Sequence, residues 1–496
     1  MKRIIYIVLA ITTIATSCKK FLEEMPPSIV LPSNADHYEE LLYGSGYPSN
    51  TNGYSKFIEL PTDDVEWIHI PNPNSAYLPL REYTTKEGWG IYLYINDPES
   101  ITSNGTDAFW GECYKSIAVC NVVIEGLAKL KDDNETLRRH IKGQAHFLRA
   151  LHYLNLMNMY GMPYVKGQDS EWGVPIKTST IPEDRAFQRN TVHEVYALMK
   201  ADADSGVALC DPNQKLKIYE ANWYAAVILA SRIHLYMENY DEVIRLGEMY
   251  LSRKSELPPS TAALTNGLFT GFTAAWSGVS PNPEVVFNYG TNPSTYNSVY
   301  QASTGYDYFH ISQSLRDEFA KSLKPGEVDN RLTNPAGNVA SWFFGVASSR
   351  LVPRKIYNFN TRKSSFRTGE LILNLAEAYA KKGQIDNAVS QLNYLRSSRI
   401  QNYQGFTSAD FTQESLITFT REERRRELCF EDHRLPDLKR YGMPALEHII
   451  QDFTGRYRVR LEQGDFGYIF QIPLKERNLN YEIKRLPRPE RIIEPI

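Results

Sequence analysis

Cysteine is scarce in this sequence, with five residues in 496. Cys113 and Cys120 lie seven positions apart on an expected helix, which separates them by roughly 10 Å along its axis and excludes a disulfide between them. No two cysteines have the spacing of a zinc site. We therefore expect the four cysteines after residue 18 to be small buried hydrophobic residues.

Long apolar runs and an excess of either charge are also missing. After residue 18, no stretch approaches the ~20 uninterrupted apolar residues that a membrane-spanning helix needs. The 55 basic and 58 acidic side chains nearly cancel, to a formal net charge of −3. This balance gives no reason to expect a nucleic-acid partner.

Motifs of known catalytic and cofactor sites are missing as well. The sequence has no HExxH pair, GxSxG serine, phosphate-binding glycine loop or dinucleotide fingerprint. Asp63, Asp64 and Glu66 could form a metal site or a catalytic carboxylate pair, but their spacing is unspecific, and we interpret them as turn-capping residues. We expect no catalytic residue, no metal site and no cofactor. A glycosidase carboxylate pair stays open, because the chain has 58 acidic residues.

The N-terminus has the features of an export signal. Lys2 and Arg3 form a short basic start, and a mostly apolar run of twelve residues, 4–15, follows. That run is too short to span a bilayer as a helix. The segment 15–18 (ATSC) resembles a bacterial lipoprotein cleavage box without its usual leucine. We predict a signal peptide at residues 1–17 and a lipid-modified Cys18; the alternative is an ordinary secretory peptide.

Between residues 109 and 252, apolar residues recur at the spacing of α-helices. The first such face steps by three and four residues through Phe109, Cys113, Ile117, Cys120, Ile124 and Leu127. A second helix, over 137–151, is expected to follow a cap within 132–134 and to stop at 160–163 (YGMP). Thr191 and Glu194 have the spacing of a capping box, which predicts the start of a third helix.

Residues 220–252 and 367–400 each indicate a helix, a tight turn and a second helix. Both have a tyrosine near the end of the first helix and an apolar residue followed by Asp before the second. This pattern resembles tetratricopeptide units. The predicted fold class is therefore mainly all-α, with about four such helix pairs in a scaffold over about 109–252 and 366–450.

Two long segments, 44–108 and 256–350, have a different composition, rich in Pro, Gly, Asn and Ser. Irregular stretches of this length are usually either functional or disordered. Both are also rich in Trp, Tyr and Phe, which disordered segments lack. We expect two ordered, aromatic insertions presented by the helical scaffold.

Several segments along nearly the whole chain match a known family in the same order. They are 18–24 (CKKFLEE), 110–121 (WxxxYxxIxxxN), 143–153 (GQAHFLRALHY), 160–163 (YGMP), 375–379 (LAEAY), 421–431 (REERRRELCFE) and 468–473 (YIFQIP). By these segments the chain resembles the SusD/RagB family of outer-membrane nutrient-binding lipoproteins. It departs at Tyr441, where the family often has Trp, and at Met162, where an acidic or small residue is common.

The resemblance implies an α-helical fold and a lipoprotein anchored in the outer membrane, facing the cell exterior. It also implies a partner, a SusC-like TonB-dependent transporter, over which the lipoprotein sits as a lid. Family members bind glycans, and some bind peptides. The expected function is to bind an oligosaccharide or polysaccharide and deliver it to that transporter. The alternatives are a peptide ligand in the same role, a surface glycan hydrolase, or a scaffold that holds another protein.

A glycan would contact the two aromatic insertions. A pyranose ring packs its C–H face on an aromatic ring, at ~0.5–1.5 kcal/mol for each pairing if sugar stacking is comparable to other aromatic contacts. The predicted aromatic contacts are Trp67, Trp89, Trp276, Tyr296, Tyr306 and Trp342. The predicted polar contacts are Asn74, Asn292 and Arg350. Trp110 is left out because it belongs to the first helix.

The segment 421–440 is rich in arginine, which invites a phosphate-binding or nucleic-acid-binding interpretation. Acidic residues interrupt it, several within one helical turn of an arginine: Glu422, Glu423, Glu427, Glu431 and Asp437. We therefore interpret it as a solvated or internally paired helix.

Overall fold

The computed structural model describes residues 32–48, 55–69, 89–95, 106–131, 134–253, 284–289, 307–332, 344–347, 350–353, 364–452 and 455–496. Helices dominate these residues, as predicted. The longer ones are α3 (Ala35–Ser45), α7 (Thr106–Lys129), α8 (Glu135–Tyr160), α9 (Val192–Leu209), α10 (Trp223–Tyr236), α11 (Tyr240–Ser252), α17 (Thr368–Lys381), α18 (Ile385–Ser397) and α19 (Gln413–Leu428). The shorter ones are α4 (Ser55–Ile58), α6 (Trp89–Tyr92), α16 (Gln313–Lys321), α20 (Arg434–Arg440) and α21 (Leu474–Leu479). Within the described ranges, no helix has both the length and the apolar character that a bilayer crossing demands.

Both ends of α8 and the start of α9 lie where the local sequence predicts them. Asn134 caps α8 by accepting a hydrogen bond from the Leu137 N–H at 3.1 Å, and α8 ends at Tyr160. Thr191 and Glu194 form the predicted capping box, in which each side chain accepts the other residue's backbone N–H. Because the first N–H groups of a helix have no partner inside it, such caps specify where a helix begins.

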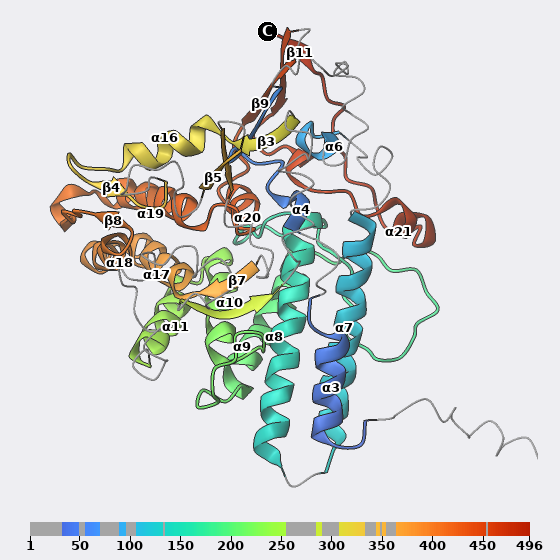
Figure 1. Cartoon of the computed structure of the whole chain (residues 1–496). Coiled ribbons are helices and arrows are strands. Elements are labelled where there is room, and N and C mark those ends of the chain that lie inside the picture. Colours follow the sequence, from blue (N-terminus) through green and yellow to red (C-terminus); the bar gives the residue numbers. More distant parts are fainter. Residues whose placement is uncertain are drawn as a thin grey trace, which may run out of the picture.

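The helices pack in an array that largely follows their order in the chain (Figure 1). Helix α7 contacts α3 and α8, and the contacts continue from α8 to α9, from α9 to α10 and from α10 to α11. Helix α17 then packs on α10 and α11, and α18 and α19 pack on α17. The long segment before α17 therefore does not interrupt the array.

Two of the helix pairs share one turn geometry. Asn239 N–H donates to His234 O between α10 and α11, and Gln384 N–H donates to Tyr379 O between α17 and α18, both at 2.9 Å. The residue before each donor has a positive φ, 58° at Glu238 and 73° at Gly383. Only glycine adopts this left-handed conformation without a steric cost. The structure thus confirms the helix–turn–helix pairs predicted over 220–252 and 367–400.

A five-stranded sheet lies at one end of α7 and α8 (Figure 1). Its strand order is β11-β10-β9-β1-β3. Strand β1 pairs antiparallel with β3 and parallel with β9, and β9 forms an antiparallel hairpin with β10. The strands are β1 (Val65–His69), β3 (Asp307–Ile311), β9 (Leu446–Asp452), β10 (Gly455–Leu461) and β11 (Glu494–Pro495).

The sequence analysis did not predict this sheet. Strand β1 and strand β3 come from the two segments, 44–108 and 256–350, that were expected to be irregular. Each is a short strand whose hydrogen-bonding partners lie elsewhere in the chain, so a local pattern of five residues does not identify it. The two insertions are thereby joined to each other and to the C-terminal part of the chain.

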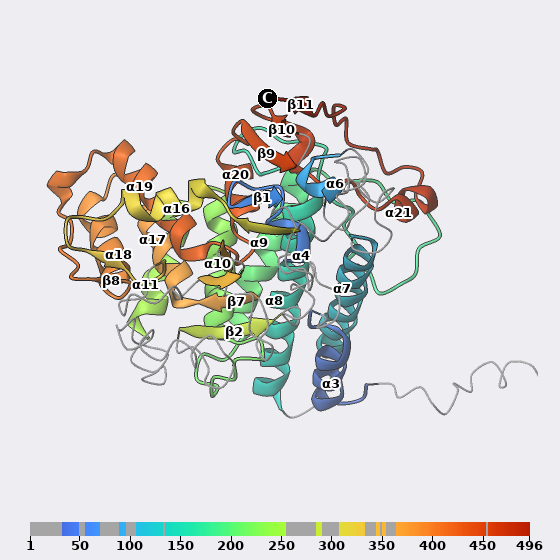
Figure 2. The same ribbon diagram turned by 45° about the horizontal axis from the view of Figure 1, so that its top comes forward.

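Three two-stranded ladders complete the strands within the described ranges. Figure 2 shows β2 and β7 side by side, and both contact α10. The ladders are β2 (Val285–Tyr289) with β7 (Ser364–Arg367), β4 (Val328–Asp329) with β8 (Ile400–Gln401), and β5 (Phe344–Ala347) with β6 (Arg350–Pro353).

Residues 423–428, the last part of the arginine-rich helix α19, are buried and internally paired. Glu427 is fully buried and accepts hydrogen bonds from Arg367, from Arg331 at 2.9 Å and from Arg399 at 2.8 Å. Internal pairing is therefore confirmed for most of the segment 421–440, but the segment is not the single helix that was expected, because α19 ends at Leu428 and α20 begins at Arg434. A buried charge needs such partners because removal from water is costly.

The four cysteines after residue 18 are all buried, as predicted. Burial raises the pKa of the Cys120 thiol to about 12, so this side chain is protonated at neutral pH. These cysteines therefore serve as small hydrophobic residues of the core.

Candidate functional site

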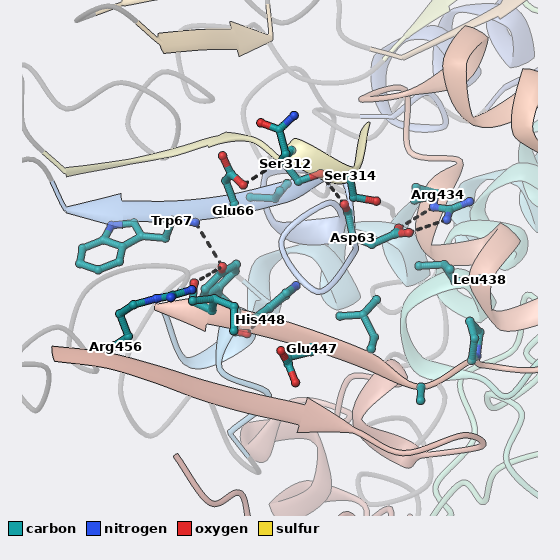
Figure 3. A pocket seen from close by; sticks show the side chains of 17 residues that line it. Asp63, Glu66, Trp67, Ser312, Ser314, Arg434, Leu438, Glu447, His448 and Arg456 are labelled. Atoms are coloured by element: carbon teal, nitrogen blue, oxygen red, sulfur yellow. Dashed lines mark hydrogen bonds and ion pairs between the residues drawn. The ribbon is translucent and has the colours of Figure 1, made fainter. Parts of the chain in front are cut away.

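A cavity of about 620 Å³ lies between the five-stranded sheet and the helices α16 and α20 (Figure 3). Segments far apart in the sequence form its wall. They are Asp63 and residues 65–67 of β1, Tyr92 of α6, residues 312–314 at the start of α16, Arg434 and Leu438 of α20, residues 444–449 before and within β9, and Arg456 of β10. The cavity therefore exists only because the sheet brings these segments together.

An ion pair forms one end of the cavity. Arg434 Nε and Nη2 each donate to the Asp63 carboxylate at 2.7 Å, and Arg425 lies 3.3 Å from the same carboxylate. Burial opposes the ionisation of Asp63, but the two arginines outweigh it and hold the pKa of this carboxyl well below its ordinary value. Asp63 is therefore an anion at neutral pH and has no proton to donate as a general acid.

Glu66 fixes the start of α16 beside the cavity. Its Oε2 accepts a hydrogen bond from Gln313 N at 3.0 Å, and its Oε1 accepts one from Arg316 Nη2 at 2.9 Å. A carboxylate at a helix N-terminus is favoured by the unpaired N–H groups and the dipole of the helix. The turn-capping interpretation is confirmed for Glu66.

The same interpretation is wrong for Asp63 and Asp64. Asp64 accepts a hydrogen bond from Arg425 Nε at 2.7 Å, and Asp63 is held by Arg434. Both carboxylates compensate buried guanidinium groups instead of capping a turn. Their arginine partners are largely buried, so an entering cation cannot displace them, and these two carboxylates are unsuitable as ligands of a cation.

Two stacked rings support strand β9 beneath the cavity. The rings of Tyr92 and His448 lie 4.1 Å apart, with 9° between their planes. His448 Nδ1 is 2.8 Å from Tyr92 O, and its Nε2 is 3.1 Å from the hydroxyl of Tyr94. Burial lowers the pKa of His448, so the ring is neutral at neutral pH. Nε2 also lies 2.9 Å from Thr62 O, so each ring nitrogen faces a carbonyl, and in either tautomer the single N–H of the neutral ring donates to one of them.

Trp67 lies at the other end of the cavity from the Asp63–Arg434 pair (Figure 3). Its backbone N–H donates to the Tyr92 hydroxyl at 3.2 Å, and the strand register places it opposite Phe309 of β3 and Ile450 of β9. Only 2% of Trp67 is exposed. Its indole therefore forms a wall of the cavity and not an open platform, and a ligand contact at Trp67 stays a prediction.

Charged side chains of the β9–β10 hairpin lie at the rim of the cavity. Arg456 is exposed, and Figure 3 shows it beneath Trp67. Glu447 accepts a hydrogen bond from Arg460 at 2.6 Å. A guanidinium offers several donors and a carboxylate offers only acceptors, so this rim can bind a ligand that carries both kinds of group.

Most residues predicted to contact a ligand lie outside the described residues. This holds for Asn74, Trp276, Asn292, Tyr296, Tyr306 and Trp342, and also for Cys18. Trp89 begins α6 and Arg350 begins β6, but only their backbones are described. Of the predicted set, the structure therefore places the side chain of Trp67 alone, and all these contacts stay predictions.

The sequence analysis missed the contribution of the C-terminal hairpin to the cavity. A signal for it exists, because Arg456, Arg458 and Arg460 alternate with Tyr457, Val459 and Leu461. This period of two is typical of a strand with one polar face. It predicts the strand, but it does not predict that β9 pairs with β1.

Two family models match the chain in separate parts. The model described as "Starch-binding associating with outer membrane" matches residues 81–235, and the model described as "SusD family" matches residues 329–487. Two relatives from Formosa agariphila match as well. SusD-like protein P25 is 22% identical over 94% of both chains, and SusD-like protein P2 is 24% identical over 70% of this chain and 74% of its own.

Solved structures share the fold. A crystal structure from Bacteroides vulgatus superposes with a TM-score of 0.71 at 22% identity, over 92% of this chain and 99% of its own. A SusD superfamily protein from Bacteroides thetaiotaomicron has a TM-score of 0.68 at 20% identity, over 92% and 100%. A SusD-like carbohydrate binding protein from Bacteroides vulgatus has a TM-score of 0.63 at 18% identity, over 91% and 98%.

Proposed function

Because the chain belongs to the SusD/RagB family, we propose that it binds an oligosaccharide or polysaccharide at the cell surface and delivers it to a SusC-like TonB-dependent transporter of the outer membrane. The observation that carries this proposal is the pair of family-model matches, one of which describes starch binding and association with the outer membrane. The chain acts in this proposal as a binding protein and not as an enzyme.

The cavity beside β1 supports a glycan as the ligand. A sugar presents hydroxyl groups that donate and accept hydrogen bonds, and a C–H face that packs against apolar surface. The cavity wall offers a hydroxyl at Ser314, a guanidinium at Arg456 and a carboxylate at Glu447, next to apolar surface from Leu446. This mixture suits a neutral, hydroxyl-rich molecule better than a purely apolar or strongly charged one.

The state of Asp63 supports binding without turnover. A glycosidase needs one carboxyl group that is protonated and a second that is ionised. Arg434 and Arg425 keep Asp63 ionised, so this member of the cavity cannot be the acid. The proposed role instead needs a site that holds the sugar and releases it unchanged.

Display at the surface rests on the N-terminal segment. We propose that Cys18 becomes the acylated N-terminus after removal of residues 1–17. Two or three acyl chains bind a bilayer firmly, since each buried methylene contributes about 0.8 kcal/mol. Metabolic labelling with a palmitate analogue should mark the wild-type chain, and a Cys18→Ser variant should stay unlabelled. A labelled Cys18→Ser variant would contradict the anchor.

Isothermal titration of the lipid-free mature protein against soluble polysaccharides and peptide digests tests the ligand. Saturable binding to one class of glycan is expected. Arg456→Gln and Glu447→Gln should each weaken it by about tenfold, which corresponds to ~1.4 kcal/mol. Both side chains lie at the surface, so their loss should leave the fold unchanged.

Arg139→Gln is the matched control, because Arg139 is an exposed arginine on α8, at the end away from the sheet (Figure 1). It should bind like the wild type. Binding of peptides alone would overturn the glycan assignment. Glycan binding that is unchanged in both cavity variants would place the ligand elsewhere. The contacts that we propose in the insertions would then be tested by substituting Trp89, Trp276, Tyr296, Tyr306, Trp342, Asn74, Asn292 and Arg350.

A further inference from the structure

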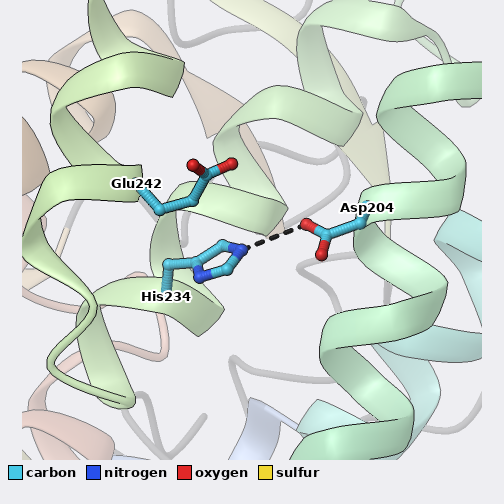
Figure 4. Close-up of side chains that lie close together, drawn as sticks. All are labelled: Asp204, His234 and Glu242. Atoms are coloured by element: carbon cyan, nitrogen blue, oxygen red, sulfur yellow. Dashed lines mark hydrogen bonds and ion pairs between the residues drawn. The ribbon is translucent and has the colours of Figure 1, made fainter.

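Three side chains from successive helices converge away from the sheet and its cavity. Asp204 lies on α9, His234 on α10 and Glu242 on α11 (Figure 4). One ligand atom from each, a carboxylate oxygen or an imidazole nitrogen, lies within 4.8 Å of the other two. These residue types are the usual nitrogen and oxygen ligands of transition metals in proteins.

The imidazole is buried and the two carboxylates reach the solvent. The side chain of His234 is 3% exposed, and its Nε2 lies 3.0 Å from Asp204 Oδ1. Asp204 and Glu242 are 37% and 32% exposed. In Figure 4 the Glu242 carboxylate approaches the same ring from α11. An ion could therefore enter from the solvent side and meet a nitrogen ligand whose position is held by the core.

Neighbouring side chains hold both carboxylates. Lys200 Nζ donates to Asp204 Oδ2 at 2.9 Å, which leaves Oδ1 facing His234. Arg245 holds both oxygens of Glu242, because its Nε donates to Oε2 at 2.9 Å and its Nη2 donates to Oε1. The side chain of Arg245 is 55% exposed, and such an exposed ion pair is weak, so an entering ion can displace it. Each ionised carboxylate has about four lone-pair positions, so it can accept these bonds and bind an ion as well. Partners of this kind orient the ligands of many metal sites.

The second ring nitrogen of His234 also has a suitable neighbour. His234 Nδ1 lies 3.4 Å from the side-chain amide of Asn239, in the turn between α10 and α11. The amide N–H donates to Nδ1, and Nε2–H donates to Asp204 Oδ1. An ion that binds Nε2 displaces this proton, because a metal ligand must be deprotonated.

We propose that Asp204, His234 and Glu242 bind one divalent transition-metal ion, with Zn²⁺ as the first candidate. An imidazole nitrogen with two carboxylate oxygens suits Zn²⁺, whereas Ca²⁺ and Mg²⁺ prefer oxygen ligands alone. The ion would join three consecutive helices of the array and stabilise their packing, because a ligand that binds only the folded state raises its stability. This role is independent of glycan binding.

Isothermal titration with ZnCl₂ tests the proposal on the lipid-free mature protein, purified without a polyhistidine tag and stripped with EDTA. We expect one Zn²⁺ per chain with a micromolar Kd, a higher Tm in the presence of Zn²⁺, and no comparable response to CaCl₂ or MgCl₂. Co²⁺ should bind competitively and give the visible absorption bands of a protein-bound ion.

Glu242→Gln is the first variant, because it keeps the size of a partly exposed side chain and removes its charge. It should weaken Zn²⁺ binding at least tenfold and abolish the rise in Tm, and His234→Ala should do the same. Asp241→Asn is the matched control, since Asp241 is the adjacent, 82% exposed acid of α11 and pairs with Lys382 instead. The absence of a 1:1 complex, or equal Zn²⁺ affinity in the wild type and Glu242→Gln, would overturn the site.

Discussion

Arg434 of α20 holds Asp63, the residue two positions before β1, through two hydrogen bonds of 2.7 Å. This ion pair fixes the start of strand β1 to a helix that is 371 residues away in the sequence. It also closes one end of the cavity beside the sheet. Both the position of β1 and the shape of the cavity therefore depend on this pair.

Asp63→Asn should destabilise the protein at neutral pH by about 2 kcal/mol. Removal of one partner from a buried ion pair costs ~3–5 kcal/mol, and we expect less because 27% of the Asp63 side chain is exposed. Because the folded-state pKa of Asp63 is depressed, its contribution is complete above the unfolded value near 4 and is lost as the pH falls below that value. Urea unfolding between pH 2 and pH 7 measures both effects, and parallel curves for wild type and variant would contradict them.

Lys439 should make the stability of the protein rise between pH 7 and pH 9. Its buried ammonium donates to three carbonyls at the end of α8: Met157 O and Asn158 O at 2.9 Å and Gly161 O at 2.6 Å. Burial lowers the pKa of Lys439 to about 7, so above pH 7 the unfolded chain binds more protons than the folded one. Stability therefore increases with pH in this range.

Lys439→Met provides the comparison, because it fills similar space and does not titrate. Between pH 7 and pH 9 the free energy of unfolding of the wild type should rise by about 2 kcal/mol relative to that of the variant. Chemical unfolding at several pH values measures this difference. A constant difference would mean that the three carbonyls keep Lys439 charged throughout this range.

Glu427→Gln should destabilise the protein by about 3–5 kcal/mol, because it leaves buried guanidinium groups short of a compensating charge. Arg331, Arg367 and Arg399 all pair with this carboxylate. Glu422→Gln is the matched control on the same helix. Glu422 pairs with Lys321, which is 62% exposed, so its loss should cost at most about 1 kcal/mol. Equal effects in urea unfolding would argue against a structural role for the buried network.

Gly143→Ala should destabilise the contact of α8 with the end of α9 by about 1–3 kcal/mol. A Cβ at this position would lie 2.6 Å from Cys210 N and 2.9 Å from Leu209 C, both backbone atoms that cannot turn away. Gly111→Ala is the opposite case on α7, since a Cβ there meets nothing within 4 Å. It should stabilise the protein by up to about 1 kcal/mol, because alanine favours a helix over glycine. Thermal unfolding of the two variants should shift Tm in opposite directions.

The candidate site was predictable in part. The composition of segments 44–108 and 256–350 indicated that they carry functional residues, which stays a prediction, and residues of β1 and of 312–314 in these segments line the cavity. The contributions of Arg434, Glu447 and His448 were not predicted. Arg434 lies in the segment 421–440, which we interpreted as a solvated or internally paired helix, and only the pairing of β1 with β9 brings the last two residues to the cavity.

By itself the sequence determined the family, the mainly helical fold and the positions of helix starts such as those capped by Asn134 and Thr191. These features rest on partners within a few residues, so a local pattern is enough to specify them. Tertiary structure alone decided that β1 lies between β3 and β9, that Glu427 is buried among arginines, and that Asp204, His234 and Glu242 meet. Each of these depends on contacts between distant segments, which are set by packing and charge compensation in the folded chain and leave no periodic trace in the sequence.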